Sequence, residues 1–354
     1  MSDQSPAERL SAEIRSLQNT YSTLQSAARL TELRDEVGTL ESTTSGLGQS
    51  VADLRMRGYV FERSMEEKGA SLAKRWAALS TSVQQQINQQ AIWLQMELRP
   101  VDTLMVQLLA SESSPDTAQP LLAQAKAAMS ALQAQVDGAE SSIRSMYDDL
   151  QQEGRSFTAR AQQIQWLLTQ LAEASFPLLA GESAIAGVKA TWVQRDKEDK
   201  SDPKGVLLLT DQRLLFEQKQ EIATRKVLFI TTEKQKVQKL LLNLNVADIG
   251  NATASKQGLF GHEDHLWVEM AHPAAVHSGH FHLDGQDCDV WQGLVSRAKS
   301  RDFDRERTDS PQAETIKVPV LPDRCPGCGG AITQPATRGM EMITCAYCGR
   351  VIRL

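Results

Sequence analysis

Apolar residues recur at alternating intervals of four and three positions over much of the N-terminal half of this 354-residue chain. The first run comprises Leu10, Ile14, Leu17, Tyr21, Leu24 and Ala28, and the second comprises Leu33, Val37, Leu40, Thr44, Leu47, Val51 and Leu54. This spacing is the heptad pattern of helices that pack along a coiled-coil seam. Because the second run is out of phase with the first, we expect a change of register or a bend near Thr31.

Helical composition continues to about residue 176. We expect further helices at about 59–99, 101–110, 121–150 and 155–174, with Pro100 kinking or ending the first of them and Gly154 near the start of the last. Gly46 and Gly48 weaken the helix around them and are a candidate break. Residues 1–176 are therefore predicted to form a helical coiled-coil region, either a hairpin bundle or an extended oligomerising rod, whose apolar stripes serve packing and not a cofactor.

Residues 177–303 have a different sequence pattern, in which short apolar runs are separated by charged or Gly/Pro turns. Candidate strands are 184–194, 205–210, 213–218, 226–232, 239–244, 266–271 and 279–284, and an amphipathic helix follows at about 286–300. We expect Asp284 or Asp287 to cap this helix. Val206, Leu208, Leu214 and Phe216 are expected to fill the interior of a barrel-like antiparallel sheet that the helix plugs.

The stretches LLAGESAIAGVKATW, KGVLLLTDQRLLFEQ and LNLNVADIGN, with the helix that bears Trp291, resemble a pleckstrin-homology-like (PH-like) domain of the GRAM type or its bacterial relatives. The resemblance covers about 125 residues. It implies a PH-like β-barrel with a C-terminal capping helix, docking to a membrane lipid or a protein. With the flanking regions, the fold class is multidomain α+β.

Four of the five cysteines form two C-x-x-C pairs, Cys325 with Cys328 and Cys345 with Cys348. Two such turns direct four thiolates at one tetrahedral metal ion, and residues 321–354 resemble a zinc ribbon. So short a module needs metal binding to fold, and four thiolates leave no open coordination position, so we expect one structural zinc per chain. A rubredoxin-like iron centre is the alternative. Residues 304–320 are a linker by composition.

The six histidines lie between His262 and His282. His280 and His282 share one strand face, so a second metal site is conceivable, although we favour the polar half of an alternating strand. The full set is His262, His265, His272, His277, His280 and His282. Cys288 lies near them, and we interpret it as a buried thiol and not as a nucleophile.

In many PH-like domains, basic residues on the first strands and the loop that joins them bind anionic headgroups. By this resemblance the ligand-binding candidates are Lys189, Arg195, Lys197, Lys200, Lys204 and Arg213. The loop also contains Asp196, Glu198, Asp199 and Asp202. A solvated loop of mixed sign is therefore the alternative.

The net charge of −6 argues against a nucleic-acid partner, and neither a signal peptide nor a transmembrane segment is evident. We find no catalytic motif and predict no enzyme activity. The sequence favours a cytosolic scaffold or adaptor, peripheral at the inner face of a membrane, that self-associates or binds a protein partner through its coiled coils. The alternative is a nucleic-acid-binding or regulatory protein that acts through the ribbon, where Arg324, Arg338, Arg350 and Arg353 outnumber the acidic residues.

Overall fold

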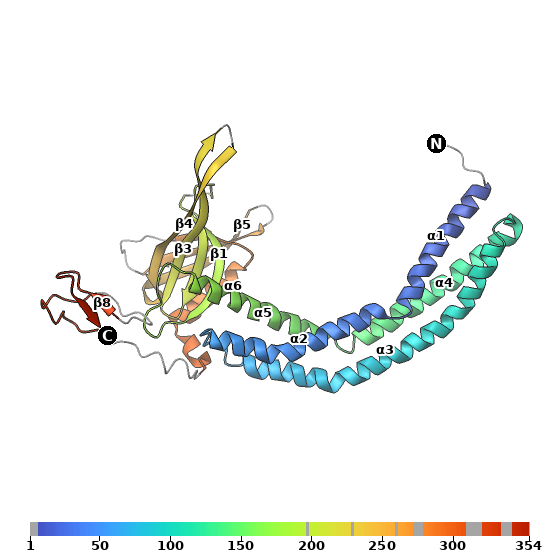
Figure 1. Cartoon of the computed structure of the whole chain (residues 1–354), viewed down its shortest axis with the longest axis horizontal. Helices are drawn as coiled ribbons and strands as arrows, with labels where there is room; N and C mark the ends of the chain where they lie inside the picture. The colour runs from blue at the N-terminus through green and yellow to red at the C-terminus, as the bar shows by residue number, and fades with distance from the viewer. Residues whose placement is uncertain are drawn as a thin grey trace. The chain divides into compact units, whose positions relative to one another are not determined.

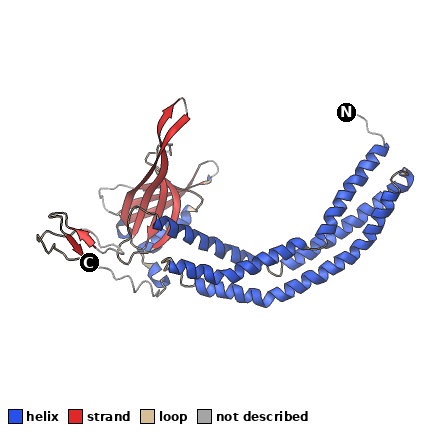
Figure 2. Cartoon of the chain, viewed as in Figure 1, coloured by secondary structure: helices blue, strands red, loops and turns tan. Residues whose placement is uncertain are grey.

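The computed structural model of the protein describes residues 6–195, 198–227, 230–258, 261–271, 279–308, 321–333 and 342–353. Its contacts divide the chain into two compact units. The first comprises Met1–Gly48 and Glu67–Thr158, and the second comprises Gln49–Glu66 and Ala159–Leu354. Figure 1 traces the long helices and the sheet by residue number, and Figure 2 separates them by type of secondary structure.

Long helices occupy the N-terminal half of the chain, as predicted. They are α1 (Pro6–Ala27), α2 (Thr31–Met56), α3 (Met65–Ala110), α4 (Pro115–Arg144) and α5 (Asp148–Ala172). Every residue of the two predicted apolar runs is buried except Tyr21, which is partly buried. The apolar spacing thus identified the packing faces of α1 and α2, while supercoiling and self-association stay predictions.

The expected change of register near Thr31 is a break between two helices. Three residues, Ala28 to Leu30, join α1 to α2. Leu30 has φ of 53°, in the left-handed region, and both Ala28 and Leu30 are buried. Because burial of these side chains stabilises a conformation that is otherwise unfavourable for leucine, the junction is a fixed bend.

Three expected interruptions lie inside continuous helices. Gly46 and Gly48 fall within α2, Pro100 falls within α3, and Gly154 falls within α5. Each glycine costs a helix about 1 kcal/mol relative to alanine. In α2 the burial of Leu47, which lies between the two glycines, and of Val51, which follows them, offsets that cost. Side-chain packing therefore outweighs local helix propensity here.

The second unit contains a seven-stranded antiparallel sheet with strand order β4-β3-β2-β1-β7-β6-β5. Its strands are β1 (Ala184–Trp192), β2 (Lys204–Thr210), β3 (Arg213–Val227), β4 (Ile230–Asn245), β5 (Ile249–Gln257), β6 (Glu263–Met270) and β7 (Gly279–Leu283). Helix α6 (Cys288–Lys299) follows and contacts β5 and β6. Seven strands and a closing helix agree with the PH-like arrangement that the resemblance implies. We call the sheet and α6 the β domain.

Two of the expected strands are wrong in detail. The predicted strand 213–218 is only the first part of the longer strand β3. The predicted strand 226–232 is not a single strand, because it includes the end of β3 and the start of β4. The predicted strand 239–244 is a later part of β4. Strand β5 was not expected, because Ile249 is its only buried residue. A strand so exposed carries little of the alternating apolar signal on which prediction depends.

The predicted closed barrel is not formed among the described strands. The sheet ends at β4 on one side and β5 on the other, and no described pairing joins them. Both faces of β2 are buried, so its apolar run does not alternate. Val206 and Leu208 cluster with Leu167 of α5, whereas Phe216 belongs to an aromatic group on the opposite face with Trp192 and Phe281. The four residues expected in one interior therefore lie on two faces.

The expected capping of α6 is confirmed for Asp287, whose carboxylate accepts the backbone N–H groups of Asp289 and Val290. Trp291 of α6 is fully buried. None of the described helices is long and apolar enough to cross a membrane.

The C-terminal cysteine module contains a short antiparallel pair, β8 (Met342–Thr344) and β9 (Val351–Arg353). Ile343 and Ile352 form a small core with Cys325 and Cys345, against which Leu321 and Ile332 pack.

Candidate ligand pocket and metal centre

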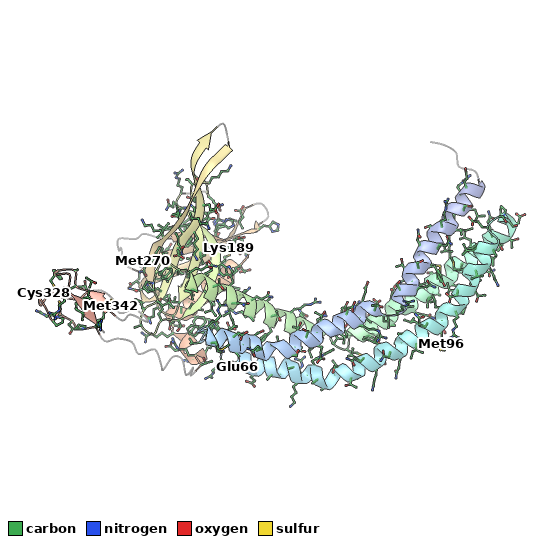
Figure 3. The ribbon with its side chains drawn as sticks, in the orientation of Figure 1. Glu66, Met96, Lys189, Met270, Cys328 and Met342 are labelled. Atoms are coloured by element: carbon green, nitrogen blue, oxygen red, sulfur yellow. The ribbon has the colours of Figure 1, made fainter. Side chains whose placement is uncertain are left out.

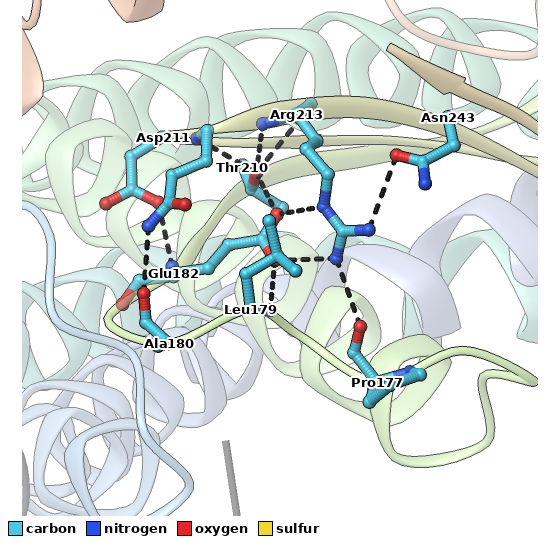
Figure 4. Close-up of polar contacts among 10 residues, drawn as sticks. Pro177, Leu179, Ala180, Glu182, Thr210, Asp211, Arg213 and Asn243 are labelled. Atoms are coloured by element: carbon cyan, nitrogen blue, oxygen red, sulfur yellow. Dashed lines mark hydrogen bonds and ion pairs between the residues drawn. The ribbon is translucent and has the colours of Figure 1, made fainter. Parts of the chain in front are cut away.

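Arg213, one of the predicted ligand-binding residues, is buried in an ion pair. Its guanidinium donates through Nε to Glu182 Oε1 at 2.9 Å and through Nη2 to Glu182 Oε2 at 2.7 Å. It also donates to the Pro177 carbonyl and to Asn243 Oδ1 (Figure 4). Arg213 is 5% exposed and Glu182 is 0% exposed, so Arg213 does not reach a surface ligand. Because its charge already has a buried partner, the geometry argues against Arg213 as a residue that binds a surface ligand.

Two other predicted residues, Lys189 and Lys204, line one pocket of about 390 Å³ beside β1, β2 and β7. Figure 3 labels Lys189 on β1. Thr191 of β1 pairs with Lys204 of β2, so Lys189 and Lys204 are diagonal neighbours on the same face of the sheet. Lys219 of β3 joins them at the pocket wall, together with Trp166 and Gln170 of α5. The strand register thus gathers three lysines that the sequence separates by up to 30 residues.

The lysines of this pocket differ in how their charge is compensated. Lys219 Nζ lies 3.5 Å from Glu173 Oε2 and 3.7 Å from Glu217 Oε2. Among the described residues, neither Lys189 nor Lys204 has an ion-pair partner. Two ammonium groups beside an indole ring can bind a phosphate or another anionic headgroup.

Two acidic residues, Glu198 and Asp284, also line this pocket. Glu198 from the β1–β2 loop contacts His282 Nδ1 at 2.5 Å, and Asp284 is exposed. The carboxylate of Asp202 accepts the backbone N–H groups of Gln194 and Asp199. Asp202 is buried and is not among the residues that line the pocket, so its carboxylate shapes the β1–β2 loop.

The remaining predicted basic residues lie in the β1–β2 loop. Arg195 pairs with Asp199 at 3.0 Å on the surface, and Lys200 is exposed. Lys197 lies outside the described residues. Lys219, in contrast, was missed by the sequence reasoning, although it occupies the strand position directly beyond the Gly205–Gln218 pair.

Two histidines are buried, unlike the exposed strand face that the sequence favoured. His265 Nδ1 and His280 Nε2 are 2.9 Å apart, and these residues are 3% and 5% exposed. Burial, and then the nearby histidines, hold the pKa of His280 at about 4, and burial also lowers the pKa of His265. In the described part of the chain, no histidine belongs to a metal-binding group. His272 and His277 lie outside that part.

Cys288 is fully buried at the start of α6. Burial, followed by its contact with Asp264, raises the pKa of the thiol. A raised pKa disfavours the thiolate that a nucleophilic cysteine needs.

The four C-terminal cysteines converge on one point. Cys325 Sγ lies 3.8 Å from Cys348 Sγ, and Cys328 Sγ lies 3.6 Å from Cys345 Sγ. All four sulfur atoms lie within 4.8 Å of one another. A tetrahedron with Zn–S bonds of about 2.3 Å has S···S edges of about 3.8 Å, so the spacing fits a four-thiolate zinc ion.

The two cysteine turns have the same backbone form. Gly329 N–H donates to Cys325 O, and Gly349 N–H donates to Cys345 O. Both glycines have positive φ, 73° and 70°, a conformation that suits glycine. Backbone N–H groups at each turn lower the pKa of Cys325 to about 6 and also lower that of Cys345. At Cys325 and Cys345 the turns therefore favour the thiolate form that a metal ion binds, whereas the neighbouring cysteine sulfurs raise the pKa of Cys328.

Comparison with solved structures gives distant similarity to PH domains. The chain is similar to the Vps36 N-terminal PH domain (15% identity, TM-score 0.24, 35% of this chain and 83% of that one) and to the Slm1 PH domain in complex with inositol-4-phosphate (14%, 0.22, 33% and 96%). It is also similar to the DH/PH domains of PDZ-RhoGEF in complex with activated RhoA (11%, 0.24, 84% and 96%). No family model and no curated protein matches the chain. The PH-like assignment therefore rests on the strand order and the closing helix.

Proposed function

We propose that this protein is a non-enzymatic adaptor whose β domain binds anionic lipid headgroups at the Lys189–Lys204 pocket. The helices serve self-association or binding of a protein partner, and the C-terminal ribbon is a small recognition module held by one structural zinc ion. One observation carries the lipid proposal: two lysines on adjacent strands line one pocket, and the described residues give neither an ion-pair partner.

Charge favours this ligand class. An anionic headgroup can take Lys189 and Lys204 as its direct cationic contacts, and the partly buried Lys219 lies behind them. Because the contacts are electrostatic and close to solvent, binding should weaken as salt rises. The attraction of a basic cluster to an anionic membrane amounts to about 1 kcal/mol per lysine, so two lysines give weak, reversible docking.

The test is co-sedimentation of the full-length protein with phosphatidylcholine vesicles that contain phosphatidylserine or a phosphoinositide. We expect binding at low salt that the double substitution Lys189→Glu and Lys204→Glu abolishes. The matched control reverses the exposed Lys68 and Lys74 on α3, with the same change in net charge, and should bind like the unaltered protein. Equal binding to vesicles of phosphatidylcholine alone, or equal loss in the control, would refute the proposal.

The cysteine geometry supports the zinc proposal. The ribbon core contains only a few apolar side chains, so loss of the metal should unfold it. Metal analysis of the purified protein should give one zinc per chain, and Cys345→Ser should remove it and make the ribbon sensitive to protease. Cys288→Ala, which alters the buried cysteine outside the ribbon, should retain the metal. Bound iron with a thiolate charge-transfer absorption would contradict the zinc assignment.

A further inference from the structure

Helix α3 exposes two large apolar side chains near the junction of α1 and α2. Ile92 is 65% exposed and Met96 is 53% exposed. They are four residues apart and therefore lie on the same helix face; Figure 3 labels Met96 on α3. The neighbouring positions Ala91 and Leu94 are buried, so this face is separate from the packing face of α3.

A shallow groove of about 740 Å³ lies over these side chains. Its other wall is the α1–α2 junction, which contributes Arg29, Thr31 and Arg34. The bend at Leu30 creates this wall, because α1 ends and α2 begins there while α3 continues without interruption. The groove therefore lies entirely within the first unit of the chain.

The charged residues that line the groove are all basic. Arg29, Arg34 and Arg99 line it, and none of the residues that line it is acidic. Arg34 donates to the neutral Asn88 Oδ1 at 2.8 Å, and no described ion pair involves Arg29 or Arg99. Because α1 ends at Ala27 and α2 begins at Thr31, opposite ends of two helix dipoles meet at this junction, and the positive charge of the groove comes from its arginines.

Two arginines elsewhere in the same unit, Arg75 and Arg144, have acidic partners. Arg75 pairs with Glu153 at 2.7 Å, and Arg144 pairs with Glu36 at 3.1 Å. Three guanidinium groups around an exposed apolar pair thus form a local excess of positive charge that the helical unit does not compensate.

We infer that this groove binds an acidic, amphipathic segment of a partner protein. The apolar residues of the segment would cover Ile92 and Met96, and its carboxylates would pair with Arg29, Arg34 and Arg99. Guanidinium groups bind carboxylates through paired hydrogen bonds, and helical segments commonly place apolar residues at i and i+4 into such grooves. An apolar pair between the arginines suits a peptide better than a nucleic-acid backbone, which presents phosphates and sugars along its edge.

The test uses full-length protein and a fluorescein-labelled amphipathic helix with glutamate on one face and leucine on the other, followed by fluorescence anisotropy. We expect saturable binding that falls about tenfold or more with Arg29→Glu plus Arg99→Glu, and likewise with Ile92→Ser plus Met96→Ser. Circular dichroism should show unchanged helix content, since all four side chains are exposed.

Matched controls are available on α1 and α3 of the same unit. Arg9→Glu plus Arg15→Glu on α1 makes the same change in charge, and Val106→Ser on α3 removes an equally exposed apolar side chain. Both should bind the peptide within about twofold of the unaltered protein. No saturable binding by the unaltered protein, or equal loss in the controls, would overturn the inference. Binding that an isomeric peptide with scrambled apolar positions reproduces would also overturn it, because charge alone would then explain it.

Discussion

Substituting Arg213 with methionine removes one side of the buried ion pair that ties β3 to the segment before β1. Removing one partner of a buried pair costs about 3–5 kcal/mol, because the other charge stays buried without compensation. Glu182 would keep hydrogen bonds from the Thr210 hydroxyl at 2.6 Å and from the Leu179 N–H at 2.5 Å. We therefore expect a cost near the lower limit, about 3 kcal/mol.

The measurement is hydrogen exchange of the full-length protein, resolved by peptide. A chain with two compact units need not unfold in one step, so a local measurement is more informative than a single melting temperature. A cost of about 3 kcal/mol raises the local opening equilibrium about 10²-fold, and the effect should appear in peptides of β1, β2 and β3.

A double substitution distinguishes the ion pair from simple packing. Glu182→Leu with Arg213→Met should cost less than the sum of the two single changes, since no unpaired charge remains. Arg195→Met, which breaks the exposed pair with Asp199, should leave exchange unchanged. Additive single costs, or exchange in Arg213→Met within about twofold of the unaltered protein, would refute the reasoning.

Two further predictions concern the β domain. Burial holds the pKa of His280 at about 4, below its value of 6.5 in an unfolded chain. The contribution of neutral His280 to the free energy of unfolding should therefore be complete above pH 6.5 and be lost as the pH falls toward 4. His280→Gln should flatten this pH profile in urea titrations, and an unchanged profile would contradict the assignment. Gly205→Ala places a Cβ 1.9 Å from the Glu217 carbonyl oxygen and should cost about 2–3 kcal/mol. At Gly46 on α2, an added Cβ would meet no atom within 4 Å beyond its own turn of helix, so Gly46→Ala should instead stabilise by about 0.5–1 kcal/mol. Chemical denaturation compares the two variants, and changes of the same sign would contradict this account.

The basic residues of the candidate pocket show how far prediction from sequence extends. Lys189 and Lys204 were expected to act together, and the β1–β2 register places both at one pocket. Arg213 was grouped with them by strand position, but Glu182, 31 residues earlier in the chain, binds it in the interior. Lys219 was missed because its position at the pocket depends on the pairing of β2 with β3, which sequence spacing alone does not specify.

The sequence by itself determined the packing faces of α1 and α2, the change from helices to strands after residue 176, and the convergence of the four cysteines. These features follow from local periodicity and spacing, which act over a few residues at a time. Only the tertiary structure decided that helix α2 continues through Gly46 and Gly48, that the sheet stays open, and which basic side chains are paired. Those outcomes depend on contacts between residues distant in the chain, where burial and charge pairing outweigh local propensity.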